Sequence, residues 1–164
     1  MWLPDRRALL ATGAAALLGG CGFEPIYGKD GAARRVSGQI AVADITGHLG
    51  FEMRRQLTDR LGDAAAAPFR LEVTYWTDSE ALAITPEAEI TRFNVAGRAE
   101  YRLVDVSGGR LVSAGKARAF AAYSANDAPI STRAAERDAD LRLAAALANQ
   151  IATRILVDAE SWLP

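Results

Sequence analysis

The sequence predicts an α+β domain in which two amphipathic helices cover one face of a mostly antiparallel four-stranded sheet, that is, a two-layer α/β sandwich. Two observations lead to this fold class. Apolar side chains recur at every second position in four segments, which is typical of strands, and at every third or fourth position in two others, which is typical of helices. These segments follow one another in the order β-α-β-β-β-α. A length of 164 residues suits one domain.

The first two elements are a short strand and a helix. Residues 39–46 carry Ile40 and Val42 on one side, which predicts the strand. Residues 48–62 predict a helix, because apolar residues stand four apart and so line one helical face. These residues are Leu49, Met53, Leu57 and Leu61.

Three longer segments alternate between apolar and polar residues and predict strands at 69–76, 89–106 and 111–123. A Ser-Gly-Gly-Arg sequence at 107–110 indicates a hairpin between the last two. Trp76 and Phe120 fall out of phase with the apolar side of their strands. They indicate either a partner surface or a second buried layer.

The last helix is predicted over residues 133–158, after a loop at 124–132. Leucine and isoleucine form its apolar stripe, at Leu143, Leu147, Ile151 and Ile155. Alanines flank the stripe at positions 144, 148 and 152, and such small side chains allow a helix to approach a sheet closely.

The N-terminus predicts an export signal with a lipid anchor. Arg6 and Arg7 precede an apolar stretch of eleven residues, 8–18, which is too short to span a membrane. Leu-Gly-Gly-Cys follows and is similar to a lipobox, so we expect residues 1–20 to be a lipoprotein signal peptide and Cys21 to be lipidated. A plain signal peptide with a chance cysteine is the alternative. Residues 21–38 then form a lipidated tether and residues 39–164 the domain. The Gly22 that follows the cysteine favours the outer membrane.

Composition excludes several classes of function. The 19 basic and 20 acidic residues leave a net charge of −1, which argues against a nucleic-acid partner. One cysteine and one histidine exclude a zinc finger, a disulfide framework and a Cys/His metal cluster. The lone His48 has no candidate nucleophile beside it, so we expect no catalytic residues, no metal site and no cofactor.

Arginine supplies 17 of the 19 basic residues. Several cations fall on the polar sides of neighbouring predicted strands, where they could bind an anionic amphiphile, since guanidinium groups pair with phosphates. A GC-rich genome, which replaces lysine by arginine throughout, is the alternative explanation. The candidate cations are Arg92, Arg98, Arg102, Lys116 and Arg118.

The sequence Cys-Gly-Phe-Glu-Pro-Ile-Tyr-Gly at 21–28 resembles the mature start of the LPS-assembly lipoprotein family, LptE, in its alphaproteobacterial form. Ala-Glu-Tyr at 99–101 is also similar to that family. The resemblance implies a non-enzymatic, lipid-anchored protein of the cell outer membrane. It would plug and help to assemble the LPS-assembly β-barrel, LptD, and bind lipopolysaccharide during its insertion into the outer leaflet. By the same resemblance, Arg133 is the candidate lipopolysaccharide contact near the start of the last helix. An ordinary solvent-facing arginine in the first helical turn is the alternative.

An auxiliary, periplasm-facing lipoprotein of an ABC-type phospholipid or solute transport system is the alternative. It too would combine a lipobox with a small α/β domain. The sequence leaves open which faces would contact a barrel, the stoichiometry, and whether any binding of lipopolysaccharide is direct.

Overall fold

A computed structural model describes residues 26–28, 31–62, 64, 66–84, 90–126 and 128–163. The predicted signal peptide at 1–20 and the predicted lipidation site, Cys21, lie outside the described residues.

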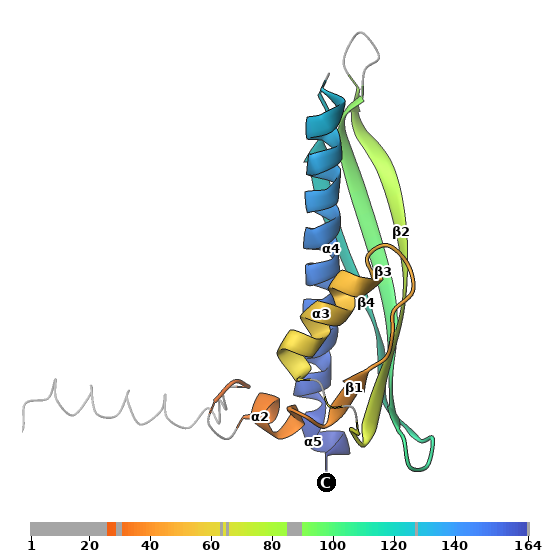
Figure 1. Ribbon diagram of the computed structural model, residues 1–164, viewed down its shortest axis with the longest axis vertical. Helices are drawn as coiled ribbons and strands as arrows, with labels where there is room; N and C mark the ends of the chain where they lie inside the picture. Colours follow the sequence, from red (N-terminus) through yellow and green to blue (C-terminus); the bar gives the residue numbers. More distant parts are fainter. Residues whose placement is uncertain are drawn as a thin grey trace, which may run out of the picture.

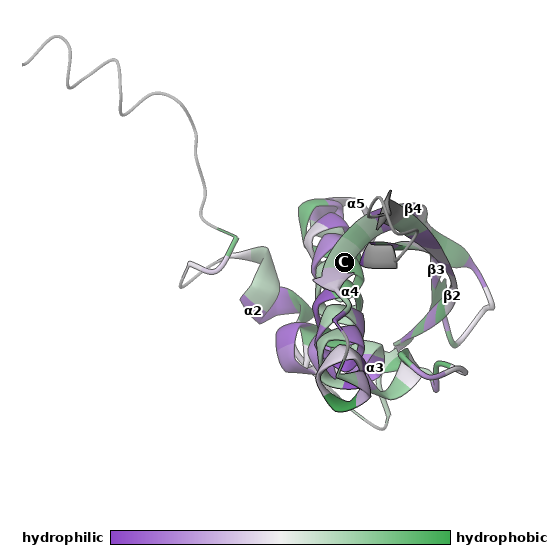
Figure 2. Ribbon diagram, turned by 90° about the horizontal axis from the view of Figure 1, so that it is seen from above, coloured by the Kyte–Doolittle hydropathy of each residue, from purple (hydrophilic) through white to green (hydrophobic). Residues whose placement is uncertain are grey.

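The fold is the predicted sheet covered on one face by helices (Figure 1). The sheet has the strand order β1-β2-β3-β4, with β1 parallel to β2 and the other neighbours antiparallel. Seen end-on, the sheet is an arc with α3 and α4 on its concave side (Figure 2). The elements in chain order are α2 (Ala32–Val36), β1 (Ile40–Val42), α3 (Gly50–Leu61), β2 (Phe69–Ile84), β3 (Ile90–Asp105), β4 (Leu111–Ser124), α4 (Pro129–Val157) and α5 (Ala159–Trp162).

The hydrophobic core lies between the sheet and the helices. The predicted stripes of α3 and α4 are fully buried there, together with leucines of β2 and β3. Small residues let α4 lie close to the sheet. A Cβ atom added to Gly97 of β3 would stand 3.0 Å from methyl groups of Leu143 and Leu147. The alanines beside the α4 stripe are buried as well, in agreement with the close approach expected from the sequence.

Part of the segment expected to be a tether, residues 21–38, belongs to the folded domain. α2 lies at residues 32–36, and Val36 is fully buried in the core. The backbone N–H of Ala33 donates a hydrogen bond to the carbonyl of Ile26, at 3.0 Å. The spacing of apolar residues does not predict this helix, because five residues make little more than one turn.

α4 begins four residues earlier than expected, at Pro129. Proline suits the first position of a helix, because its missing N–H would have had no partner there. Asn126 supports this start, since its side-chain oxygen accepts hydrogen bonds from the Ala128 N–H at 3.2 Å and from the Ser131 hydroxyl at 2.6 Å. The loop expected at 124–132 is shorter as a result.

Side chains of α4 bond to the outer edge of β4. Gln150 donates to the carbonyl of Arg118 at 2.8 Å and accepts from its N–H at 3.3 Å. Arg142 donates to the carbonyl of Ala122 at 3.1 Å, and Arg154 donates to that of Lys116. Such contacts occupy backbone groups through which an edge strand could pair with another chain.

We expect Tyr75→Phe to lower the free energy of unfolding by about 1 kcal/mol, the usual net value of a hydrogen bond. The Tyr75 hydroxyl accepts a bond from the N–H of Leu49 at 2.9 Å, and so fixes the loop between β1 and α3. Urea unfolding measures the change. Tyr123→Phe is the control, because the Tyr123 ring stacks on Phe93 and no hydrogen bond of its hydroxyl is present among the described residues. Equal losses in the two variants would contradict the assignment.

Candidate functional site

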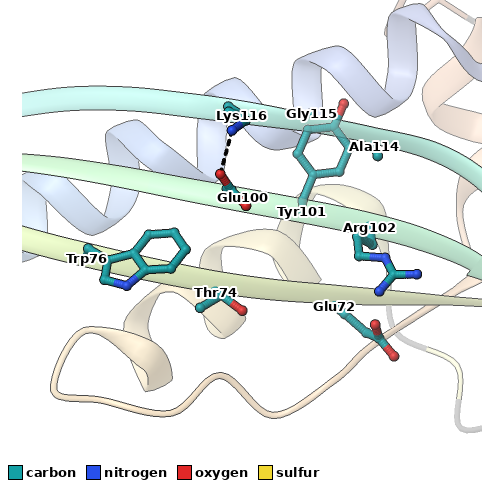
Figure 3. Close-up of a pocket in the computed structure, with 9 residues that line it drawn as sticks. All are labelled: Glu72, Thr74, Trp76, Glu100, Tyr101, Arg102, Ala114, Gly115 and Lys116. Carbon is teal, nitrogen blue, oxygen red and sulfur yellow. Dashed lines mark ion pairs between the residues drawn. The ribbon is translucent and has the colours of Figure 1, made fainter.

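The candidate site lies on the face of the sheet that no helix covers, here called the helix-free face. Even-numbered residues at positions 70–80 of β2, 92–104 of β3 and 114–124 of β4 point to this face and are mostly exposed. Strand register aligns them in rows that run across the three strands. A hollow of about 590 Å³ lies over three of these rows (Figure 3). It is lined by Glu72, Thr74, Trp76, Glu100, Tyr101, Arg102, Ala114, Gly115 and Lys116.

One row carries an unusual juxtaposition of like charges. Arg98 of β3 stands directly opposite Arg118 of β4. Like charges opposite one another destabilise a sheet. Glu100, two residues from Arg98 on the same face, pairs with Lys116, whose Nζ lies 2.7 Å from its Oε1 (Figure 3). No ion pair relieves Arg98 or Arg118 within the part of the chain that the structure describes. An anion bound between the two guanidinium groups would relieve the repulsion.

Exposed aromatic rings lie beside this arginine pair. Trp76 of β2 is opposite Arg98 in the same row and is 54% exposed. Phe120 follows Arg118 two residues along β4 and is 77% exposed. Their exposure excludes one of the two alternatives left open by the sequence, because neither ring lies in a second buried layer of the described residues. Apolar rings next to paired cations suit a ligand that is both anionic and apolar.

The structure brings four of the candidate cations together and separates two. Arg98, Arg102, Lys116 and Arg118 occupy three successive rows of the helix-free face. Arg92 is six residues further along β3, or about 20 Å at the usual rise per residue.

Arg133 lies near the N-terminus of α4, exposed and in the helix layer. It is therefore not part of the helix-free face. Trp76 also belongs to the site. The only sequence signal for it was that it falls out of phase with the apolar side of its strand. The hollow itself had no sequence signal, because it depends on how the strands pair.

The described residues show no arrangement typical of catalysis. His48 is exposed, and its Nε2 lies 3.7 Å from Oδ2 of Asp140, without a nucleophile in the pair. Asp138 pairs with Arg142 at 2.9 Å. Within the described ranges, no three His, Cys, Asp or Glu side chains gather closely enough to hold a metal ion. A search of those same ranges for a helix long and apolar enough to cross a membrane also finds none.

Comparison with known proteins identifies similar chains. The profile of the family described as "LptE: Lipopolysaccharide-assembly" matches residues 37–155, which is more than half of the chain. This range includes the whole helix-free face and almost all of α4. No match is found among the curated proteins.

Solved structures share the fold. A protein described as a lipoprotein from Caulobacter crescentus is 25% identical, with a TM-score of 0.64, over 79% of this chain and 98% of that one. Lipoprotein B from Nitrosomonas europaea is 14% identical, with a TM-score of 0.56, over 76% and 85% of the two chains. Rare lipoprotein B from Shewanella oneidensis is 16% identical, with a TM-score of 0.50, over 75% and 92%. The last two likenesses concern the fold alone.

Proposed function

Because the chain belongs to the LptE family of lipopolysaccharide-assembly proteins, we propose that it is an outer-membrane lipoprotein that binds lipopolysaccharide directly on the helix-free face. The family is non-enzymatic, in keeping with a site built of cations and aromatic rings. We further propose that the domain plugs the LPS-assembly β-barrel, LptD, and helps it to assemble.

The observation that carries this proposal is the arginine pair, Arg98 and Arg118, beside the exposed Trp76. Lipopolysaccharide is an anionic amphiphile, with phosphates on an acylated sugar. Guanidinium groups bind phosphate oxygens with two parallel hydrogen bonds, which makes paired arginines suited to such a headgroup. The exposed rings of Trp76 and Phe120 offer apolar contacts to the rest of the ligand.

The shape and surface of the domain support the barrel as partner. The body is elongated, with α4 running along most of its length (Figure 1). Its helix-free face is rich in charged side chains, which would stay hydrated in the water-filled lumen of a large barrel.

Recovery of partners from the native membrane tests this proposal. The tagged, lipidated protein is purified from detergent-solubilised outer membranes, and its partners are identified by mass spectrometry. We expect a large β-barrel protein in stoichiometric amount, together with lipopolysaccharide. Recovery of ABC-type transporter subunits without a barrel would contradict the proposal and favour the alternative function.

We expect Cys21→Ala, produced in large excess over the barrel so that few copies can be held as a plug, to abolish acylation and to move the protein from the membrane fraction to the soluble periplasmic fraction. Stable anchoring requires two or more acyl chains, and the proposed modification of Cys21 supplies all of them. Fractionation followed by immunoblotting measures the shift. Gly28→Ala, close to the anchor but outside the lipobox, is the control and should remain membrane-bound. A Cys21→Ala protein that resists a high-salt wash of the membranes would contradict the anchor.

A further inference from the structure

The outer edge of β2 is open along its second half. The neighbouring strand β1 pairs only with residues 69–71 of β2. Beyond that point β2 continues to Ile84 with β3 on one side, and none of the described residues forms a strand on the other. Figure 1 shows this half of β2 at the right-hand margin of the molecule, above the loop that follows β1.

The backbone groups at this edge point outward at odd-numbered residues. The N–H of Phe69 donates to the carbonyl of Gln39, and the carbonyl of Leu71 accepts from the N–H of Ala43. Both groups therefore face the β1 side, and the orientation repeats every second residue along an uninterrupted strand. The pairing with β3 has no irregularity before Ala81. Thr77, Ser79 and Ala81 thus each present an N–H and a carbonyl to the open side.

The two outer edges of the sheet, β4 and β2, differ in how far their outward backbone groups are hydrogen-bonded. On β4, side chains of Gln150, Arg142 and Arg154 bond to the outward backbone groups. On β2, no hydrogen bond within the described residues reaches the outward groups of positions 77, 79 and 81. Proline, charged side chains and bulges commonly protect exposed edges. The stretch Thr-Asp-Ser-Glu-Ala at 77–81 has no proline, the irregularity in its pairing lies beyond Ala81, and its only charges are acidic.

The charge of the side chains at residues 77–81 determines which kind of incoming strand can pair with this edge. Asp78 and Glu80 are exposed on the helix-free face, and no described cation lies within ion-pair distance of either. A second copy of this chain is disfavoured. Antiparallel β2–β2 pairings centred on residue 78, 79 or 80 would all place carboxylates opposite carboxylates, which is destabilising. Lysine or arginine at alternate positions of the incoming strand would instead form cross-strand ion pairs.

We propose that the β2 edge at residues 77–81 pairs with an extended, basic strand of the barrel partner, by addition of one strand to the sheet. The pairing rests on the proposed function, since the barrel supplies the strand. The backbone of Thr77, Ser79 and Ala81 provides the hydrogen bonds, and Asp78 and Glu80 select the basic side chains.

Hydrogen exchange of the purified complex tests the pairing. The lipidated protein is compared alone and in complex with the barrel isolated from outer membranes. We expect the amides of Thr77, Ser79 and Ala81 to exchange about a hundredfold more slowly in the complex, because each would be newly hydrogen-bonded. The amide of Arg118 is the internal reference, since it is already bonded to Gln150 in the free protein.

Two variants test the chemistry. Asp78→Lys is expected to weaken the complex about fivefold or more, because it would oppose a basic strand. Asp158→Lys, an equal charge change at an exposed position between α4 and α5, is expected to leave it unchanged. Ser79→Pro removes one outward N–H and is expected to weaken the complex further. The thermal stability of each free variant is measured in parallel to establish that it is folded.

The outcomes separate the two proposals. A complex that forms without slower exchange at residues 77–81 would overturn the strand pairing and leave the proposed function in place. Absence of any complex with the barrel would overturn both. Slower exchange in the protein alone that disappears on dilution would show pairing between copies, and would also overturn the inference.

Discussion

Replacement of both Arg98 and Arg118 by alanine is expected to weaken the binding of lipopolysaccharide about 30-fold. A hydrogen bond to a charged group contributes roughly 1.5–3 kcal/mol, which we discount to about 1 kcal/mol for each exposed arginine. Two such losses correspond to about 30-fold in the dissociation constant. Titration of detergent-dispersed lipopolysaccharide into a protein that begins at Cys21, followed by calorimetry, measures the change.

The control for this double variant is Arg55→Ala. Arg55 is an exposed arginine of α3, paired with Glu52 at 2.6 Å and Asp59 at 3.1 Å, and lies in the helix layer. Its removal should leave binding unchanged. A double Arg→Lys variant at 98 and 118 keeps the charge but loses the planar fork, and is expected to bind with intermediate affinity. Binding by the double alanine variant as tight as that of the unaltered protein would refute the role of the arginine pair.

Gly50→Ala is expected to lower the free energy of unfolding by about 2 kcal/mol. A Cβ atom at Gly50, the first residue of α3, would stand too close to the carbonyl oxygen of Ile45, which belongs to the backbone. The loop 45–49 would have to move, although Tyr75 fixes it through Leu49. Overpacking costs about 3 kcal/mol at the upper end of its usual range. Alanine returns at most about 1 kcal/mol through its higher helix propensity, so the clash dominates.

The matched control for this substitution is Gly108→Ala, in the turn between β3 and β4. No atom lies within 4 Å of the position that its Cβ would take. We therefore expect less than about 0.5 kcal/mol of change, as at other exposed positions. Urea unfolding of both variants measures the two changes in the free energy of unfolding. A Gly50→Ala protein as stable as the Gly108→Ala protein would show that the loop 45–49 moves without loss of stability, and would contradict the prediction.

The sequence predicted the longer elements that pack against the core, missed the short helices α2 and α5, and was least accurate where packing ends. Alternation between apolar and polar residues identified β2 up to Trp76, although the strand continues to Ile84. Thr77, Ser79 and Ala81 lie on the helix side but are exposed. No apolar residues were needed there, so the alternation stopped before the strand did.

The sequence could predict which face of the sheet carries the candidate site, but not which residues stand opposite one another on neighbouring strands. The alternation of apolar and polar residues alone placed the candidate strand cations on the polar side of the strands. Continued without interruption, the pairing of Val104 with Leu111 beside the turn would place Arg98 opposite Ala117. The irregularity between Leu103 and Val104 shifts the pairing by one residue, to Arg118. Such a bulge depends on local backbone geometry that a single sequence does not reveal. The arginine pair therefore emerged only from the structure.

The most direct test of the central claim, that lipopolysaccharide binds the helix-free face, is the NMR signal of two indole groups. From Cys21 onward the sequence has two tryptophans: Trp76, which is 54% exposed beside the arginine pair, and Trp162, which is 6% exposed in the core. Detergent-dispersed lipopolysaccharide is titrated into ¹⁵N-labelled protein, and detergent alone into a matched sample. We predict that the indole N–H resonance of Trp76 shifts only with lipopolysaccharide, while that of Trp162 stays in place. Binding that leaves the Trp76 resonance unchanged would contradict the account.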